Sequence, residues 1–389
     1  MADMDRVDRV LATGAETQAV AGVVAMAATR DDVVYQGAYG KRELGKPAPM
    51  TLDTVGWIAS MTKAVTGAAA MQLVEQGRLA LDEPISTVLP QLADPQVLLG
   101  FQPDGTPRTR PAQRPITLRH LLTHTSGHTY DIWNTEMGRW HAHAGVPGIT
   151  GCQKAALTTP LIADPGDRWE YGIGIDWAGQ AVEAVAGTDL ETYLRANLFE
   201  PLGMRDTAFR ITPSMRERLA SIHARAEDGS LAPFPFELAQ APEFQMGGGG
   251  LYSTAGDYLR FARTILRGGE LDGARVLRAE TVDTMAANAI GEVDVAMPMR
   301  TAMPPFSVDV DVFPGMRKKW GLSFMINTEQ APTGRSAGSL AWAGLANSYY
   351  WIDRSRGVCG VFVSQTLPFA DPRAIGLFGD FESAVYQAI

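Results

Sequence analysis

The chain has 389 residues, of which 46% are hydrophobic and 20% are charged, and its formal net charge at pH 7 is −9. This length and composition are typical of a globular protein with a large buried core and room for two lobes. The negative charge argues against nucleic acid as a partner, because nucleic-acid-binding surfaces need clustered Lys and Arg.

The N-terminal part is predicted to form a helix and a β-hairpin. Residues 4–13 carry apolar side chains at helical spacing, and the β-rich runs 20–28 and 33–39 are joined by four polar residues. Another apolar run follows, and Ser60 then stands at the start of a predicted helix that stops at Gly77.

The first of these apolar runs could imitate a secretory signal. Four acidic residues and only two arginines precede it, whereas a signal peptide begins with a positively charged segment. No apolar stretch is long enough to cross a bilayer. We therefore expect a cytoplasmic protein that does not associate with membranes.

The middle of the chain is predicted to contain helices and long loops. Prolines at 107, 111 and 115 indicate a loop, and residues 188–199 carry apolar side chains on one helical face. Further on, residues 257–266 are predicted to be helical. The C-terminal part is rich in strand-like segments before a helical tail at 371–389; these segments are residues 320–327, 340–352 and 358–365.

Strands at both ends of the chain, with helices between them, predict an α/β (α+β) fold. Residues 1–84 and 246–389 would form a discontinuous antiparallel-sheet lobe flanked by helices. Residues 85–245 would form an inserted, mainly helical lobe. We expect the active site between the two lobes.

The sharpest local pattern is Ser60-Met61-Thr62-Lys63. Side chains three positions apart share one face of a helix, so the hydroxyl and the amine can meet. A serine hydroxyl is a weak nucleophile at neutral pH, and a desolvated lysine with a lowered pKa can activate it. Because Ser-x-x-Lys also arises by chance, the pattern needs support from the rest of the chain.

That support comes from several segments that occur in a fixed order over nearly the whole chain. With them the chain resembles the serine β-lactamase and penicillin-binding-protein superfamily, and within it the class C β-lactamases and the family VIII carboxylesterases. The segments are Ser60–Lys63, His120–Gly127, Pro165–Gly172, Pro201–Met204, Gly248–Asp257 and Trp342–Gly344.

The resemblance implies roles for three side chains at matching positions. Ser60 matches the nucleophile, and Lys63 matches the lysine of the first motif. Tyr171 matches the tyrosine of the second motif, which is expected to help the nucleophile lose its proton and then to protonate the leaving group. Whether Lys63 or Tyr171 accepts the serine proton stays open, because strongly coupled groups titrate as a set.

Trp342, Ala343 and Gly344 occupy the place of the third motif, on a strand at the edge of the site. Leu345 and Ser60 would contribute backbone N–H groups to an oxyanion hole. A tryptophan that walls a substrate pocket and one that fills a core have the same sequence pattern, so both interpretations of Trp342 remain.

Two departures from the superfamily pattern narrow the predicted activity. β-Lactamases and peptidases carry a Lys or His where this chain has Trp342, and that cation grips the substrate carboxylate. The second motif usually ends in Asn, and this chain has Ile173 there, so we expect Ile173 to line a more apolar pocket. The sequence therefore predicts a carboxylesterase that acts on small, short-chain esters, with weak or absent β-lactam turnover.

Two other functions remain as alternatives. The same acyl-enzyme could pass its acyl group to an alcohol or amine, as an acyltransferase or amidase does. A catalytically silent binding protein on this scaffold is the other alternative, although the intact Ser60, Lys63 and Tyr171 set argues against it. The sequence does not indicate the natural substrate, the acyl-chain preference or the oligomeric state.

Gly334-Arg335-Ser336-Ala337-Gly338 matches the nucleophile elbow of α/β-hydrolases. That elbow needs a strand–turn–helix and a histidine later in the chain, but all six histidines precede it. We therefore expect no catalytic role for Ser336.

The tetraglycine at 247–250 lacks the Lys-Ser or Lys-Thr of a phosphate loop, and we expect a tight turn beside the site.

His120, His124 and His128 are spaced by four residues, which raises the question of a metal site. No Glu stands among them in a zinc-protease arrangement, so we expect capping and loop-anchoring roles and no metal or cofactor. Cys152 and Cys359 are too few for a disulfide framework. The sequence leaves one bridge between them open, but we expect both to be small buried side chains.

Overall fold

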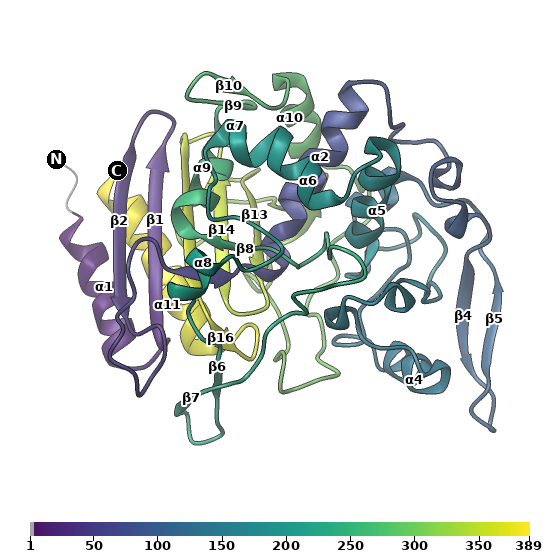
Figure 1. Cartoon of the computed structure of the whole chain (residues 1–389), viewed down its shortest axis with the longest axis horizontal. Helices are drawn as coiled ribbons and strands as arrows, with labels where there is room; N and C mark the ends of the chain where they lie inside the picture. The colour runs from purple at the N-terminus through teal and green to yellow at the C-terminus, as the bar shows by residue number, and fades with distance from the viewer. Residues whose placement is uncertain (1–3) are drawn as a thin grey trace.

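The computed structural model describes residues 4–389. A seven-stranded antiparallel sheet lies in one half of the protein, on the left of Figure 1. The strand order is β11-β12-β13-β14-β15-β1-β2, so strands from the two ends of the chain lie side by side. The strands are β1 Gly22–Thr29, β2 Val33–Gly40, β11 Lys318–Trp320, β12 Met325–Asn327, β13 Leu340–Gly344, β14 Ser348–Asp353 and β15 Val358–Ser364.

Helices cover both faces of this sheet. On one face lie α1 (Asp5–Glu16) and α11 (Pro372–Ala388), and on the other lies α9 (Ala255–Leu266). Side chains of β14 alternate between the faces, as strand geometry requires: Tyr349 stacks on Phe378 of α11, whereas Tyr350 packs against Tyr258 of α9. Because both faces are buried, β1 and β15 are continuous apolar runs rather than alternating ones.

Most predicted elements are confirmed, including the α/β class with its antiparallel sheet, the first hairpin and the helical tail. One prediction was too simple, because residues 340–352 form two strands, β13 and β14, rather than one continuous segment. The chain turns at residues 345–347, where Asn347 adopts a positive φ of 54°. The turn contains no Gly or Pro, and Asn347 is its only residue of a type that favours turns, so the signal for it in the sequence is weak.

The middle of the chain contains short helices and two small β-hairpins. The helices are α3 Leu118–Leu122, α4 Thr135–Ala144, α5 Gly174–Ala186, α6 Leu190–Leu194, α7 Glu200–Leu202 and α8 Pro213–Glu217, and a single π-helical turn at Arg195–Phe199 links α6 to α7. The hairpins are β4 (Gln96–Phe101) with β5 (Pro107–Pro111), and β6 (His223–Arg225) with β7 (Leu231–Pro233).

The expected loop at the prolines is therefore wrong over Pro107–Pro111, which forms β5. β5 is one strand of an isolated pair, where a missing N–H is tolerated. The predicted boundaries between the two lobes, at 84/85 and 245/246, stay a prediction.

The remaining elements are one helix and several short strands. The helix α10 (Ala279–Ala286) lies between β10 and β11 in the chain and packs near the edge of the sheet. The strands are β3 Val55–Trp57, β8 Tyr252–Thr254, β9 Glu270–Leu271, β10 Ala274–Arg275 and β16 Thr366–Leu367.

Two contacts set the position of the candidate site. β3 pairs with β8, which brings the chain before Ser60 beside the tetraglycine at 247–250. The next helix, α2 (Thr62–Glu75), is buried over almost its whole length and packs against α5. A helix that is apolar all round is a core helix, so Ser60 and Lys63 stand on a rigid support. Within residues 4–389, every helix is too short or too polar to cross a lipid bilayer.

The segment that resembles a nucleophile elbow has a structural role instead. Arg335 makes a bidentate ion pair with Glu382 of α11, at 2.6 and 2.8 Å, and both side chains are buried. The next element after Ser336 is β13, and no helix follows directly. The ion pair therefore ties α11 to the start of β13.

Replacing Glu382 with Gln should lower the free energy of unfolding by about 3–5 kcal/mol, because a buried Arg335 would lose its countercharge. Glu136→Gln is the matched control, since its ion pair with Arg139 is exposed and should contribute little. Urea unfolding of both variants measures the difference. Equal stability of the two variants would show that the buried pair does not hold α11 in place.

Candidate active site

Ser60 lies in a 3-10 turn, η1 (Ala59–Met61), at the N-terminal end of α2. Its neighbours Ala59 and Met61 are buried, but Ser60 itself is partly exposed. Ala59 has a positive φ of 44°, which is uncommon for a residue other than glycine and is a form of strain found at functional sites.

The end of β13 packs directly on this turn. A Cβ atom on Gly344 would lie 2.3 Å from the carbonyl oxygen of Ile58, so only glycine allows the approach. This contact brings the predicted third motif, Trp342–Gly344, to Ser60, as the sequence predicted.

The Lys63 amine is held by three partners. Its Nζ lies 3.1 Å from Ser60 Oγ and 3.0 Å from the hydroxyl of Tyr130, and it also donates to the carbonyl oxygen of Gly248. The two tyrosine rings of the site stand over the amine, with centroid distances of 5.2 Å to Tyr130 and 4.8 Å to Tyr171. The predicted contact between Ser60 and Lys63 is therefore present in the structure.

The tetraglycine supplies backbone carbonyl groups to the walls of the site. The carbonyls of Gly247, Gly248 and Gly249 accept hydrogen bonds from Thr66, Lys63 and Trp57 in turn. This confirms the tight turn expected from the sequence. No side chain fits at Gly248, where a Cβ atom would lie 2.5 Å from Asp176 Oδ2.

Burial sets the proton affinity of Lys63. The side chain is fully buried, and this loss of hydration lowers its pKa toward neutrality, while the negative charge of Asp176 acts in the opposite direction. Burial in turn raises the pKa of Asp176, which lies on α5. Asp176 Oδ1 accepts a 2.8 Å hydrogen bond from the Gly248 N–H, and Oδ2 has no hydrogen-bond partner within residues 4–389.

Tyr171 lies just before α5 and contacts both Ser60 and the Lys63 amine. Burial raises its pKa, and hydrogen bonds with Ser60 and Trp342 oppose that rise. The indole N–H of Trp342 donates to the Tyr171 hydroxyl at 3.0 Å. Trp342 is therefore a buried core residue that also contacts a predicted catalytic residue, and its place in a substrate pocket stays a prediction.

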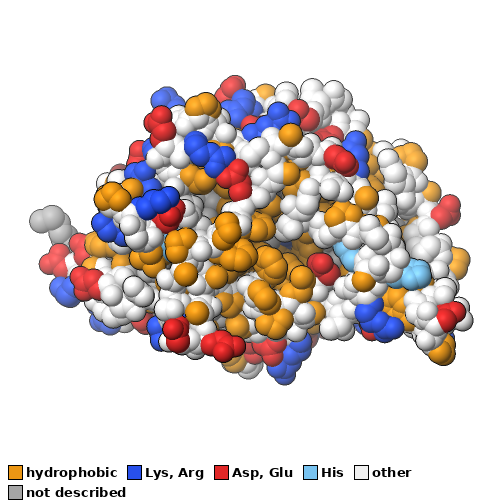
Figure 2. Space-filling view, turned by 60° about the horizontal axis from the view of Figure 1, so that its bottom comes forward, with side chains coloured by type: hydrophobic (Ala, Val, Ile, Leu, Met, Phe, Trp, Pro, Cys, Tyr) orange, Lys and Arg blue, Asp and Glu red, His pale blue; other side chains and the backbone are white. Residues whose placement is uncertain are grey.

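An aromatic enclosure surrounds the amine and the Tyr171 ring. Trp133 and Trp342 meet that ring edge-on at centroid distances of 5.2 and 5.1 Å, and Trp169 stacks on it at 6.0 Å. Hydrophobic side chains also gather around a hollow near the middle of the face shown in Figure 2. This apolar setting explains the desolvation of Lys63.

The sequence analysis missed two residues of this arrangement, Tyr130 and Asp176. Tyr130 follows the His120–Gly127 segment by three positions, and Asp176 follows Tyr171 by five. The only indication of Tyr130 or Asp176 in the sequence is that each is a polar residue close to a recognised motif. Ile173 is buried at the N-terminal end of α5, where its carbonyl accepts the Asp176 N–H; its place in a substrate pocket stays a prediction.

Two of the histidines have structural roles. His120 forms a reciprocal cap with Thr117 at the start of α3, and His124 packs among Trp169, Tyr171 and Trp320. Among the residues that the structure describes, no group of His, Cys, Asp and Glu could hold a metal ion. Both cysteines are buried and unpaired.

Comparison with known proteins agrees with this geometry. The Beta-lactamase family model matches residues 7–382. The chain belongs to this family. It is 33% identical to a lovastatin esterase of Penicillium rubens over 91% of both chains, and 33% identical to the monacolin J acid methylbutanoyltransferase of Aspergillus terreus over 95% of this chain and 92% of that one.

Solved structures show the same fold. The LovD6 mutant of simvastatin synthase from Aspergillus terreus has a TM-score of 0.85 and 32% identity, covering 98% of this chain and 96% of that one. EstCE1, a hydrolase with promiscuous acyltransferase activity, has a TM-score of 0.77 over 98% of both chains at 23% identity, which supports the fold alone. Together the family and these relatives support a serine hydrolase or acyltransferase, while the finer assignment to the family VIII esterases stays a prediction.

Replacing Asp176 with Asn should shift the pH dependence of catalysis. Asn keeps an oxygen for the Gly248 N–H but removes the charge that holds the pKa of Lys63 up against burial. Activity that needs a neutral Lys63 rises as pH rises through that pKa. We therefore expect the ascending limb of the kcat/KM profile with p-nitrophenyl butyrate to move to lower pH by about one unit.

Asp257→Asn is the matched control, because Asp257 is also buried but bonds Thr207 and the backbone of Asp206 instead. Its profile should keep the wild-type ascending limb. If the ascending limb of the kcat/KM profile does not move in Asp176→Asn, or moves equally in both variants, the charge of Asp176 does not set the pKa of Lys63.

Proposed function

We propose that this protein takes a short acyl group from an ester onto Ser60 and passes it to an alcohol, with water as the competing acceptor. The observation that carries the proposal is the buried Lys63 amine, 3.1 Å from Ser60 Oγ. A neutral amine has two N–H donors and one lone pair. With the donors directed to Tyr130 and the Gly248 carbonyl, the lone pair faces the Ser60 hydroxyl.

In the first half-reaction Ser60 Oγ attacks the ester carbonyl carbon while its proton moves to Lys63 Nζ. The developing oxyanion would be held by the backbone N–H groups of Ser60 and Leu345. Neither N–H has a hydrogen-bond acceptor elsewhere in the described part of the chain. The carbon–oxygen bond to the leaving alcohol then breaks, which leaves the acyl group on Ser60.

Tyr171 would protonate the leaving alkoxide. Its raised pKa keeps the hydroxyl protonated before the reaction, so Lys63 is the better proton acceptor of the two. The Trp342 N–H stabilises the phenolate that Tyr171 becomes for a moment, until Lys63 returns the proton. The second half-reaction runs these steps in reverse with the acceptor alcohol or water.

Two relatives named above favour an alcohol as the acceptor, since one is a methylbutanoyltransferase and the other a synthase. The aromatic rings of Trp133, Trp169 and Trp342 around Tyr171 also give the site an apolar wall, which suits an apolar alcohol better than water.

Simple hydrolysis, which the sequence predicted, is the second candidate. It is supported by the relative named as a lovastatin esterase. Weak β-lactam turnover follows from the missing cation at Trp342. Lys318 and Lys319 on the edge strand β11 do not replace that cation. Their amines already bind acidic side chains and backbone carbonyls.

The test is a series of p-nitrophenyl esters, from acetate to 2-methylbutanoate, with and without 1-butanol, beside a chromogenic cephalosporin. We expect rapid release of p-nitrophenol, formation of the butyl ester, and little cephalosporin cleavage. A free acid as the sole product at every butanol concentration would assign hydrolysis instead of transfer.

Ser60→Ala should lose at least about a thousandfold in p-nitrophenol release, as removal of a serine nucleophile does in other hydrolases. Ser336→Ala is the matched control and should keep wild-type activity. Full activity in Ser60→Ala would disprove the acyl-enzyme, and an inactive wild-type protein would support a silent binding protein.

A further inference from the structure

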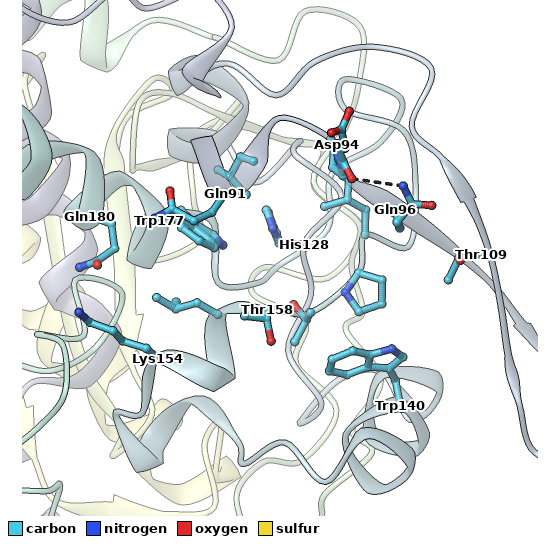
Figure 3. Close-up of a pocket in the computed structure, with 16 residues that line it drawn as sticks. Gln91, Asp94, Gln96, Thr109, His128, Trp140, Lys154, Thr158, Trp177 and Gln180 are labelled. Atoms are coloured by element: carbon cyan, nitrogen blue, oxygen red, sulfur yellow. Dashed lines mark hydrogen bonds between the residues drawn. The ribbon is translucent and has the colours of Figure 1, made fainter. Parts of the chain in front are cut away.

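A second cavity, of about 550 Å³, lies in the middle part of the chain (Figure 3). Its walls come from β4 and β5, the segment before β4, α4, the segment 154–161 and α5. Ser60, Lys63 and Tyr171 are not among its lining residues. The cavity is therefore separate from the candidate active site.

Three buried polar side chains of this cavity lack full hydrogen bonding. Trp177 Nε1 and Thr159 Oγ1 have no partner within residues 4–389, although each side chain is more than nine-tenths buried. Buried polar groups normally find a partner in the protein or in a ligand or water. Two unpaired groups on one cavity therefore point to a bound molecule that supplies hydrogen-bond acceptors.

His128 adds a third donor. It is buried, and burial lowers its pKa to about 3, so the ring is neutral. Its Nδ1 lies 3.0 Å from the Ser126 hydroxyl. In the tautomer in which Nδ1 accepts from that hydroxyl, Nε2 carries the ring proton and is a donor. Figure 3 shows the ring among the residues that surround the cavity.

The remaining lining includes flat apolar surfaces, one positive charge, one carboxylate and several uncharged polar side chains, namely Gln91, Gln96, Thr109, Thr158 and Gln180. Trp140 and Trp177 lie on opposite sides of the cavity in Figure 3. Lys154 lies on the same side of this view as Trp177; its side chain is exposed, and the Glu183 carboxylate interacts with its charge. The one carboxylate of the lining, Asp94, lies on the opposite side of the view from Lys154.

We propose that this cavity binds a small carboxylate with a flat apolar body, of which benzoate is the simplest example. The carboxylate would accept hydrogen bonds from Trp177 and Thr159 near Lys154, and the ring would lie against the indole of Trp140. The lining mixes apolar side chains with polar ones, and a few convergent donors beside an apolar surface can fix the orientation of a small molecule. The proposal does not depend on chemistry at Ser60.

The test is calorimetric titration of sodium benzoate into the Ser60→Ala protein, with benzyl alcohol as the uncharged comparison. We expect saturable binding of one benzoate, and weaker binding of benzyl alcohol. Trp177→Phe keeps a flat ring but removes the N–H, so benzoate should bind about fivefold more weakly. Lys154→Met, at an exposed position that should not affect folding, should weaken benzoate but not benzyl alcohol.

Trp133→Phe is the matched control, because its indole N–H bonds Ser307 beside the candidate active site. It should leave benzoate binding unchanged. The proposal is overturned if benzoate does not saturate, or if neither Trp177→Phe nor Lys154→Met weakens it. It is also overturned if Trp133→Phe weakens binding while Trp177→Phe does not, since benzoate would then occupy the other site.

Discussion

The burial of one amine, that of Lys63, is the constraint on which the candidate site depends. A charged ammonium is unfavourable in an apolar interior, so the lysine is displaced toward its neutral form, in which it can accept a proton. Full hydration would restore its ordinary pKa and leave Ser60 without a base. The aromatic side chains around the amine therefore act on the chemistry by excluding water.

The fold achieves this burial with segments that are far apart in the sequence. Ser60 lies in the turn before α2 and Lys63 in its first turn. Tyr130 and Tyr171 come from the middle of the chain, and the Gly248 carbonyl comes from the tetraglycine. Asp176 connects two of these segments, because it binds the Gly248 N–H from α5. Because neither the Asp176 carboxylate nor the Lys63 amine is exposed to water, the protonation state of each depends on that of the other.

The sequence revealed the parts of this arrangement that depend on local spacing. Ser60 and Lys63 are one helical turn apart, and Tyr171 lies in a recognisable motif, so all three could be named. Tyr130 and Asp176 could not, because their role depends on which side chains tertiary packing brings together. Two errors of secondary structure also depend on tertiary contacts. The turn at residues 345–347 has no Gly or Pro to indicate it. The prolines of β5 indicated a loop, but an isolated strand pair tolerates them.

The central claim is that the acyl group is carried by Ser60, and trapping it is the most direct measurement. The protein would be mixed with p-nitrophenyl butyrate, quenched in acid within the first turnovers, digested and analysed by peptide mass spectrometry. We expect one butyryl group on the peptide that contains Ser60, and no butyryl group there in Lys63→Met. A butyryl group on any other residue, or turnover with no trapped acyl group at any time, would contradict it.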